Sequence, residues 1–185
     1  MADPVRDKAF LVATLEDLEA YLLSPELYRQ ASVPTTDFTQ LTPGAVLLVH
    51  ERLRGWRLPE VEALTIRLDR IRLRWRSAWE AKALREVRAR SELWKEYLLE
   101  VQRDPREAGR LYPYQVRIRA ILTLLLNDLR QPPPETLNAL DAELHRFFHS
   151  GPFVWDEMLE WIFPAETFWF LYGTLHPGEQ HDRRP

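Results

Sequence analysis

Apolar residues recur along most of the chain at the spacing of an α-helix. Hardly any segment alternates apolar and polar residues, as a half-buried strand would. Prolines and glycines fall where helices would begin and end. The pattern therefore predicts an all-α fold, a helical bundle of five or six helices.

The first two predicted helices cover about residues 5–23 and 43–55. Leu15 and Leu18 of the first helix lie within or just after a capping box that Thr14 forms with Asp17. The second helix is preceded by Thr42 as its cap, has Pro43 in its first position and ends at Gly55. The residues between the two helices, 31–41, are expected to form a loop.

The chain from Pro59 to Pro105 contains no proline or glycine between these two positions. The simplest prediction is one helix over residues 59–103, about 65 Å long at 1.5 Å per residue, around which the bundle is organised. Ser77 and Glu80 could form a second capping box. A kink or break near this box is the alternative.

The second half of the chain is also predicted to be helical. Pro113 is expected to begin a central helix, because the residues from Ile118 to Leu129 are apolar nearly all round. Two further helical stretches are predicted over about residues 135–149 and 153–172, the latter interrupted at Pro164. The charged residues 176–185 are expected to be a disordered tail, which leaves residues 1–175 as a single domain.

The composition narrows the possible functions. The chain has 185 residues and no cysteine, which excludes disulfides, thiolate nucleophiles and cysteine-ligated metal sites. Its first residues do not resemble a signal peptide, and no apolar stretch is long enough to span a membrane. We therefore expect a soluble, cytoplasmic protein without a membrane contact.

Charge is distributed unevenly along the chain. Residues 1–51 carry 3 basic and 8 acidic side chains, residues 52–90 carry 12 and 5, and residues 91–185 carry 10 and 15. The three blocks therefore have net charges of −5, +7 and −5, which sum to the −3 of the whole chain. Such a basic segment between acidic flanks indicates either pairing within the molecule or an acidic partner.

One face of the predicted long helix carries the first candidate site. Lys82, Glu86 and Arg90 interrupt the apolar stripe at positions where leucine or valine would be expected. Charges beside aromatic residues on a core face are typical of a binding site. The predicted site for a small anion consists of Arg72, Trp75, Trp79, Lys82, Glu86 and Arg90. The alternative is an exposed ladder of salt bridges on a helix that projects into solvent.

Histidine spacing gives a weaker, second candidate. His145 and His149 are four residues apart, Asp141 precedes them by four, and His50 lies on another predicted helix. Two imidazoles at this spacing can hold one divalent metal ion. However, these side chains are displaced from the apolar side of their helix, and His149 can complement the helix dipole without a metal. We therefore expect no bound metal or other cofactor.

Two further segments have a composition that could favour partners. An arginine-rich run, Arg67 to Arg76, is flanked by Trp75 and Trp79, but no nucleic-acid-binding motif accompanies it, so nucleic acid is not expected as a partner. The stretch from Phe153 to Tyr172 is aromatic and acidic. It could dock on the arginine-rich helix, offer anchors to a partner, or simply complete the core.

These patterns contain no glycine-rich phosphate loop and no nucleophile signature. The sequence therefore favours a non-catalytic interaction or scaffolding protein over an enzyme. A helix of 65 Å would need a covering partner, for which a second copy in a homodimer is the simplest choice. The alternative function is a small anionic-ligand site or a metal-dependent site inside the helical bundle.

Overall fold

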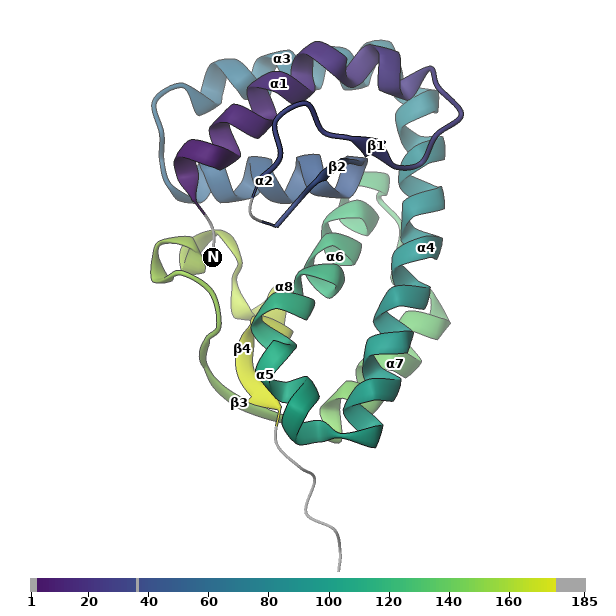
Figure 1. The fold of residues 1–185 in the computed structure, drawn as a ribbon, viewed down its shortest axis with the longest axis vertical. Helices are drawn as coiled ribbons and strands as arrows, with labels where there is room; N and C mark the ends of the chain where they lie inside the picture. Colours follow the sequence, from purple (N-terminus) through teal and green to yellow (C-terminus); the bar gives the residue numbers. More distant parts are fainter. Residues whose placement is uncertain (1–2, 36, 176–185) are drawn as a thin grey trace, which may run out of the picture.

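A computed structural model of the chain describes residues 3–35 and 37–175. Most of these residues are helical, which confirms the all-α prediction, and two small two-stranded sheets accompany the helices (Figure 1). The predicted tail at residues 176–185 lies outside the described residues. No helix in the described ranges is both long and apolar enough to cross a membrane.

The first two helices begin within about one residue of the predicted starts, although the predicted capping box of Thr14 and Asp17 lies inside the first helix. Helix α1 (Pro4–Leu22) is capped by Asp3, whose carboxylate accepts hydrogen bonds from two backbone N–H groups of the first turn. Helix α2 (Pro43–Gly55) follows Thr42, whose hydroxyl accepts from the N–H of Ala45. Residues 43–50 of α2 are all buried, so this helix lies in the centre of the molecule.

The prediction of one continuous helix over residues 59–103 is wrong, and the alternative of a break is confirmed. Helix α3 (Val61–Arg74) and helix α4 (Arg76–Arg103) are separated at Trp75, where φ is −113° and ψ is 35°. The chain turns sharply there, so that α3 lies beside α1 while α4 runs along one side of the molecule (Figure 1). The apolar stripes of both helices are thus covered by other helices of the same chain.

The predicted start of the central helix at Pro113 is also wrong. Pro113 lies inside helix α5 (Pro105–Gln115), and a second helix, α6 (Arg117–Leu129), follows after Val116. Proline in the last turn of α5 removes one backbone donor near the end of the helix, where the chain bends. Helix α6 is buried over most of its surface, as its apolar sequence predicts.

The C-terminal part contains strands that the sequence did not predict. Helix α7 (Glu135–His145) ends four residues before the predicted 149, and strand β3 (Phe148–Phe153) follows it. Strand β4 (Tyr172–Leu175) pairs antiparallel with β3. Between the strands lie η1 (Glu157–Ile162), α8 (Ala165–Phe168) and η2 (Trp169–Leu171). The predicted helix over residues 153–172 is therefore three short helical turns.

Gly173 shows why the pairing of β3 with β4 is so close. A Cβ atom at this position would lie 2.2 Å from the carbonyl oxygen of His149.

A second small sheet joins β1 (Arg29–Gln30) and β2 (Gln40–Leu41). Strand β1 lies just before the segment predicted to be a loop, and strand β2 lies within it. Strand pairing of this kind depends on contacts between distant residues, and helical periodicity does not report it.

Candidate functional site

Glu86 lies at the centre of a buried polar cluster that joins α4 to the first turn of α2. Its carboxylate accepts hydrogen bonds from the Arg90 guanidinium at 2.6 Å, the Thr42 hydroxyl at 2.7 Å and the backbone N–H of Gly44 at 2.7 Å. The carboxylate also lies at the positive end of the α2 dipole. Glu86 thus compensates both a neighbouring cation and the N-terminus of a central helix.

Burial decides between the two interpretations of this cluster. The exposed fractions of Lys82, Glu86 and Arg90 are 3%, 0% and 9%. The three residues therefore do not form the exposed ladder of salt bridges that the sequence left as an alternative.

Lys82 is held by groups of the chain itself. Its ammonium group donates to the backbone carbonyl oxygens of Ser24, at 3.0 Å, and of Glu26. It also lies 4.2 Å from the centre of the Tyr21 ring. Burial lowers the pKa of Lys82 from its ordinary value. The carbonyl oxygens and the face of the ring carry partial negative charge, which stabilises an ammonium group that has been removed from water.

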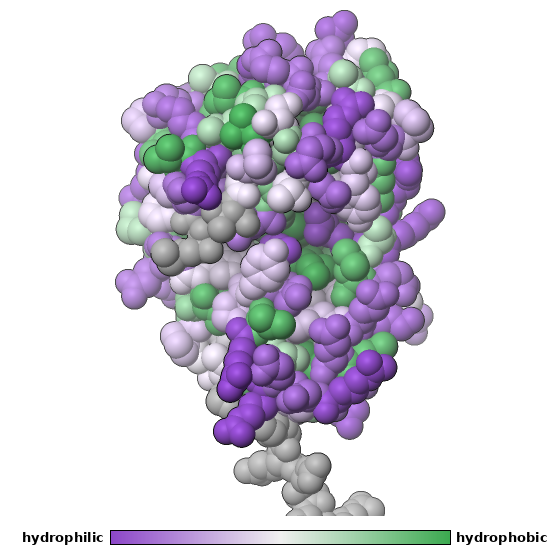
Figure 2. All heavy atoms as spheres, in the orientation of Figure 1, coloured by the Kyte–Doolittle hydropathy of each residue, from purple (hydrophilic) through white to green (hydrophobic). Residues whose placement is uncertain are grey.

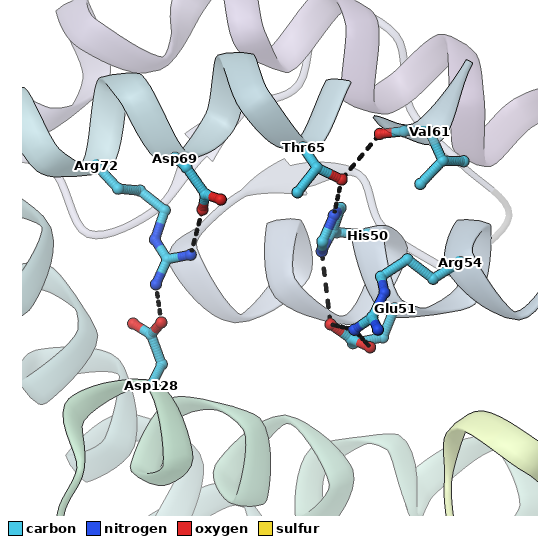
Figure 3. A network of polar contacts seen from close by, with 8 residues as sticks. All are labelled: His50, Glu51, Arg54, Val61, Thr65, Asp69, Arg72 and Asp128. Atoms are coloured by element: carbon cyan, nitrogen blue, oxygen red, sulfur yellow. Dashed lines mark hydrogen bonds and ion pairs between the residues drawn. The ribbon is translucent and has the colours of Figure 1, made fainter. Parts of the chain in front are cut away.

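Arg72, Trp75 and Trp79 lie apart from the Glu86 cluster. The guanidinium of Arg72 donates to Asp69 and to Asp128, which reaches it from α6 (Figure 3). The Trp79 indole N–H donates to the other oxygen of Asp128 at 2.7 Å. Trp75 is half-buried at the break between α3 and α4. The six residues of the predicted anion site are thus not brought together: Glu86 and Arg90 share one cluster, Arg72 and Trp79 share the contact with Asp128, and Lys82 is held separately.

The histidines named as candidate metal ligands also lie apart. His50 contacts the Thr65 hydroxyl at 2.7 Å and Glu51 at 3.5 Å, between α2 and α3 (Figure 3). Burial alone would raise the pKa of Glu51, but His50 and Arg54 outweigh it, so this pKa is lowered. This histidine is therefore part of a contact between two helices.

The other three candidate ligands lie near α7 and β3. Asp141 receives two hydrogen bonds from the Arg119 guanidinium, at 2.8 Å and 2.7 Å. His145 stacks on Trp169 with ring centres 4.0 Å apart, and His149 belongs to β3. Within residues 3–35 and 37–175, no group of three His, Cys, Asp or Glu side chains is arranged to hold one metal ion.

A pocket of about 380 Å³ lies between α2, the joint of α5 and α6, and residues 154–159, which precede and begin η1. The segments that form it can be followed in Figure 1. The lining combines apolar and aromatic side chains with four charged ones. The lining residues are Asp37, Leu48, Arg52, Pro113, Tyr114, Arg117, Val154, Trp155, Asp156 and Leu159. None of them belongs to the site predicted from sequence.

Arg52 of the lining is compensated by two carboxylates. Its guanidinium contacts both oxygens of Asp7, at 2.8 Å and 2.9 Å, and donates to Asp37 at 2.8 Å. Asp7 has no solvent exposure. Burial raises its pKa to about 6, although the attraction of Arg52 acts in the opposite direction. This triad fixes one wall of the pocket and leaves Arg52 with two acidic partners.

Arg117 of the lining has a different environment. Its guanidinium carbon lies 3.4 Å from the centre of the Tyr114 ring, and one N–H group donates to the Tyr114 carbonyl at 3.0 Å. Burial lowers the pKa of Arg117, and Arg90 adds to this effect while Tyr114 and Asp37 oppose it. In the part of the chain that the structure describes, no carboxylate lies within 4.0 Å of this guanidinium. Among the described residues, Arg117 is thus a partly desolvated cation without an ion pair.

Trp155 and Asp156 line the pocket from the segment that leads into η1. The Trp155 indole N–H donates to the carbonyl of Pro113 at 2.8 Å, and the ring packs edge-on against Phe163. The Asp156 carboxylate accepts from the backbone N–H of Met158 and caps η1. The tryptophan ring is therefore held in one orientation at the pocket by a hydrogen bond and by packing.

The arginine-rich run at residues 67–76 is largely paired within the chain. Arg67 contacts Glu16 at 2.7 Å, and Arg74 contacts Glu19 at 3.6 Å, so α1 supplies acidic partners to α3. Arg76 pairs with Glu80 at 2.7 Å on α4. The basic block thus finds part of its compensation in the acidic N-terminal block. This is the first of the two explanations that the charge distribution allowed.

Comparison with protein families, with curated proteins and with solved structures finds no match for this chain. The function is therefore inferred from the pocket and the residues around it.

Proposed function

We propose that this chain is a non-catalytic binding protein that takes a small organic molecule into the pocket between α2, the α5–α6 joint and residues 154–159. The observation that carries the proposal is the pocket itself. Its volume of about 380 Å³ falls in the range of small-molecule sites, roughly 300–1,000 Å³. Such sites typically combine an apolar and aromatic lining with a few polar groups that orient the ligand.

The lining supports binding more than chemistry. Its charged groups are two aspartates and two arginines, and among the described residues the lining includes no serine, cysteine, histidine or lysine to serve as a nucleophile with an adjacent base. Asp37 is engaged by Arg52, and Asp156 caps η1. The rings of Tyr114 and Trp155 offer flat apolar surfaces to a ligand.

This proposal corresponds to the ligand-binding alternative of the sequence, at a different place in the molecule. The case for a homodimer depended on a helix too long for its neighbours, and the break at Trp75 removes that premise. On the face in Figure 2, apolar residues lie in small groups among hydrophilic ones. Self-association stays a prediction, and sedimentation velocity measures it directly.

The first test obstructs the pocket. The probes are naphthalene-2-carboxylate and naphthalene-2-carboxamide, which share an aromatic body and differ in charge. We expect at least one of them to bind the wild-type chain in isothermal titration calorimetry. Val154→Trp places a large ring in the lining and is expected to weaken binding, because the ring occupies part of the cavity and covers apolar surface that the probe would contact.

The matched control is Leu73→Trp, because Leu73 is 75% exposed on α3 and does not line the pocket. This variant should bind the probes as the wild type does. Thermal unfolding of both variants shows that each is folded. If neither probe binds the wild type, or if Val154→Trp binds as well as Leu73→Trp, the proposed function is wrong.

A further inference from the structure

The charges that line the pocket are not equally compensated. Arg52 has two carboxylate partners, Asp7 and Asp37. Asp156 accepts a backbone hydrogen bond at the start of η1. Arg117 has only a carbonyl oxygen and the face of an aromatic ring among the contacts within the described residues. A ligand that completes the pocket electrostatically therefore needs a negative group at Arg117.

The guanidinium of Arg117 has donors to spare. A guanidinium carries five N–H donors in a planar fork that matches a carboxylate. One of these donors is used by the Tyr114 carbonyl. Stacking on Tyr114 holds the plane of the fork in place, so less side-chain freedom is lost when a ligand binds.

A cation that is partly removed from water also attracts an anion more strongly than a fully hydrated cation does. Burial lowers the pKa of Arg117, which means that the surroundings disfavour the charged form. Tyr114 and Asp37 raise this pKa, whereas the neighbouring positive charge of Arg90 lowers it, in the same direction as burial. An anionic group on the ligand would relieve both effects, whereas a neutral ligand of the same shape would leave the cation uncompensated.

The rest of the lining indicates which kind of ligand would carry the negative group. Leu48, Val154 and Leu159 supply apolar surface, while Tyr114 and Trp155 supply rings. Inorganic anions would leave this apolar surface in contact with water. A carboxylate attached to an apolar or aromatic body matches both parts of the pocket.

We infer that the ligand is a small organic carboxylate whose apolar body lies against Trp155 and whose carboxylate pairs with Arg117. This inference rests on the proposed function of the pocket. Arg117 is then the residue that determines the preference for a charged ligand, and Trp155 is a wall that contacts the apolar body.

The test compares the two naphthalene probes on the wild type and on two arginine variants by calorimetry. Naphthalene-2-carboxylate should bind the wild type about tenfold or more tightly than the carboxamide, as expected for a charge-assisted hydrogen bond. In Arg117→Gln the two probes should bind with equal affinity. Arg88→Gln is the matched control, because Arg88 is exposed on α4 and does not line the pocket, and it should retain the wild-type preference.

The possible outcomes separate this inference from the proposed function. If the carboxamide binds the wild type as tightly as the carboxylate, the pocket binds small molecules but the inference about charge is wrong. If the preference persists in Arg117→Gln, Arg117 is not its source, and the inference is again wrong. If neither probe binds, the proposed function fails and the inference fails with it.

Discussion

Asp7 illustrates how burial and ion pairing compete at a single residue. It has no solvent exposure, contacts the Arg52 guanidinium through both oxygens, and has a pKa raised from 3.8 to about 6 because burial outweighs this attraction. A group with a raised pKa in the folded state stabilises that state at low pH. The stabilisation is lost as the pH rises through the folded pKa.

The contribution of Asp7 to stability should therefore depend on pH. Between about pH 4 and pH 6 the folded state holds a proton on Asp7 that the unfolded state has released. The free energy of unfolding of the wild type, relative to Asp7→Asn, should therefore fall by about 3 kcal/mol across this window. Urea denaturation of both proteins at a series of pH values measures the difference. A difference that stays constant would mean that Arg52 cancels the effect of burial on this pKa, and a difference that rises with pH would mean that Arg52 outweighs it; either result contradicts the prediction.

For single residues, burial is easier to predict from this sequence than function. Lys82, Glu86 and Arg90 were identified because they interrupt an apolar stripe, and all three are buried. Their partners were not identifiable, since Thr42 and Gly44 lie more than 40 positions away and Lys82 is held by backbone carbonyls. Whether a charged residue faces a ligand or a helix end depends on such long-range contacts.

At the scale of elements, Glu86 is a joint between two helices. Its carboxylate connects α4 to the first turn of α2. The first turn of α2 lies close to both neighbouring helices, since a Cβ atom on Gly44 would lie 2.7 Å from the Glu86 carboxylate on α4 and 2.3 Å from Ile121 on α6. The loss of this carboxylate would leave the guanidinium of Arg90 and the N–H of Gly44 without their partner in a buried region.

We therefore predict that Glu86→Ala lowers the free energy of unfolding by about 3–5 kcal/mol, as expected when one partner of a buried charge pair is removed. Glu92→Ala on the same helix is the control. The side chain of Glu92 is 71% exposed and pairs with Lys95 at the surface, so this substitution should leave stability nearly unchanged. Equal stability of the two variants in urea denaturation would contradict the role given to Glu86.

The elements that could be predicted are those whose ends are determined by local chemistry. Thr42 followed by Pro43 marks the start of α2 because the cap and the proline act within one turn. The break at Trp75 has no glycine or proline to mark it. It accompanies long-range contacts of Arg72 and Trp79 with Asp128. Strand β4 has no local signal for a similar reason, since its partner residues on β3 lie 19 to 27 positions away.

At the scale of the whole molecule, the pocket joins segments that are far apart in the sequence. Its lining comes from residue 37, from α2, from the α5–α6 joint and from residues 154–159. No local pattern links Arg117 to Trp155, so periodicity and motif spacing could not predict the site. The signals present in the sequence were an arginine beside a tyrosine near Pro113 and a tryptophan beside an aspartate, and neither is specific.

The distribution of charge left two explanations open, and the structure contains pairs of the kind that the first one describes. The basic block meets acidic residues of the N-terminal block through Arg67 with Glu16 and Arg74 with Glu19. The same two blocks meet in the buried triad, where Arg52 contacts Asp7 and Asp37. These pairs join α1 and the following loop to α2 and α3.

The indole N–H signal of Trp155 reports directly on whether a ligand binds in the pocket. In ¹H–¹⁵N spectra, titration with naphthalene-2-carboxylate should shift this signal, since the ring lines the pocket and its N–H is fixed to the Pro113 carbonyl. The signal is assigned by its loss in Trp155→Phe. Trp161 is the internal control, because it does not line this pocket and its N–H donates to Gly55. We expect a saturable shift of the Trp155 signal while the Trp161 signal stays unchanged. If the Trp155 signal stays unchanged, or if both signals move alike, the probe does not bind specifically in this pocket and the proposed function is wrong.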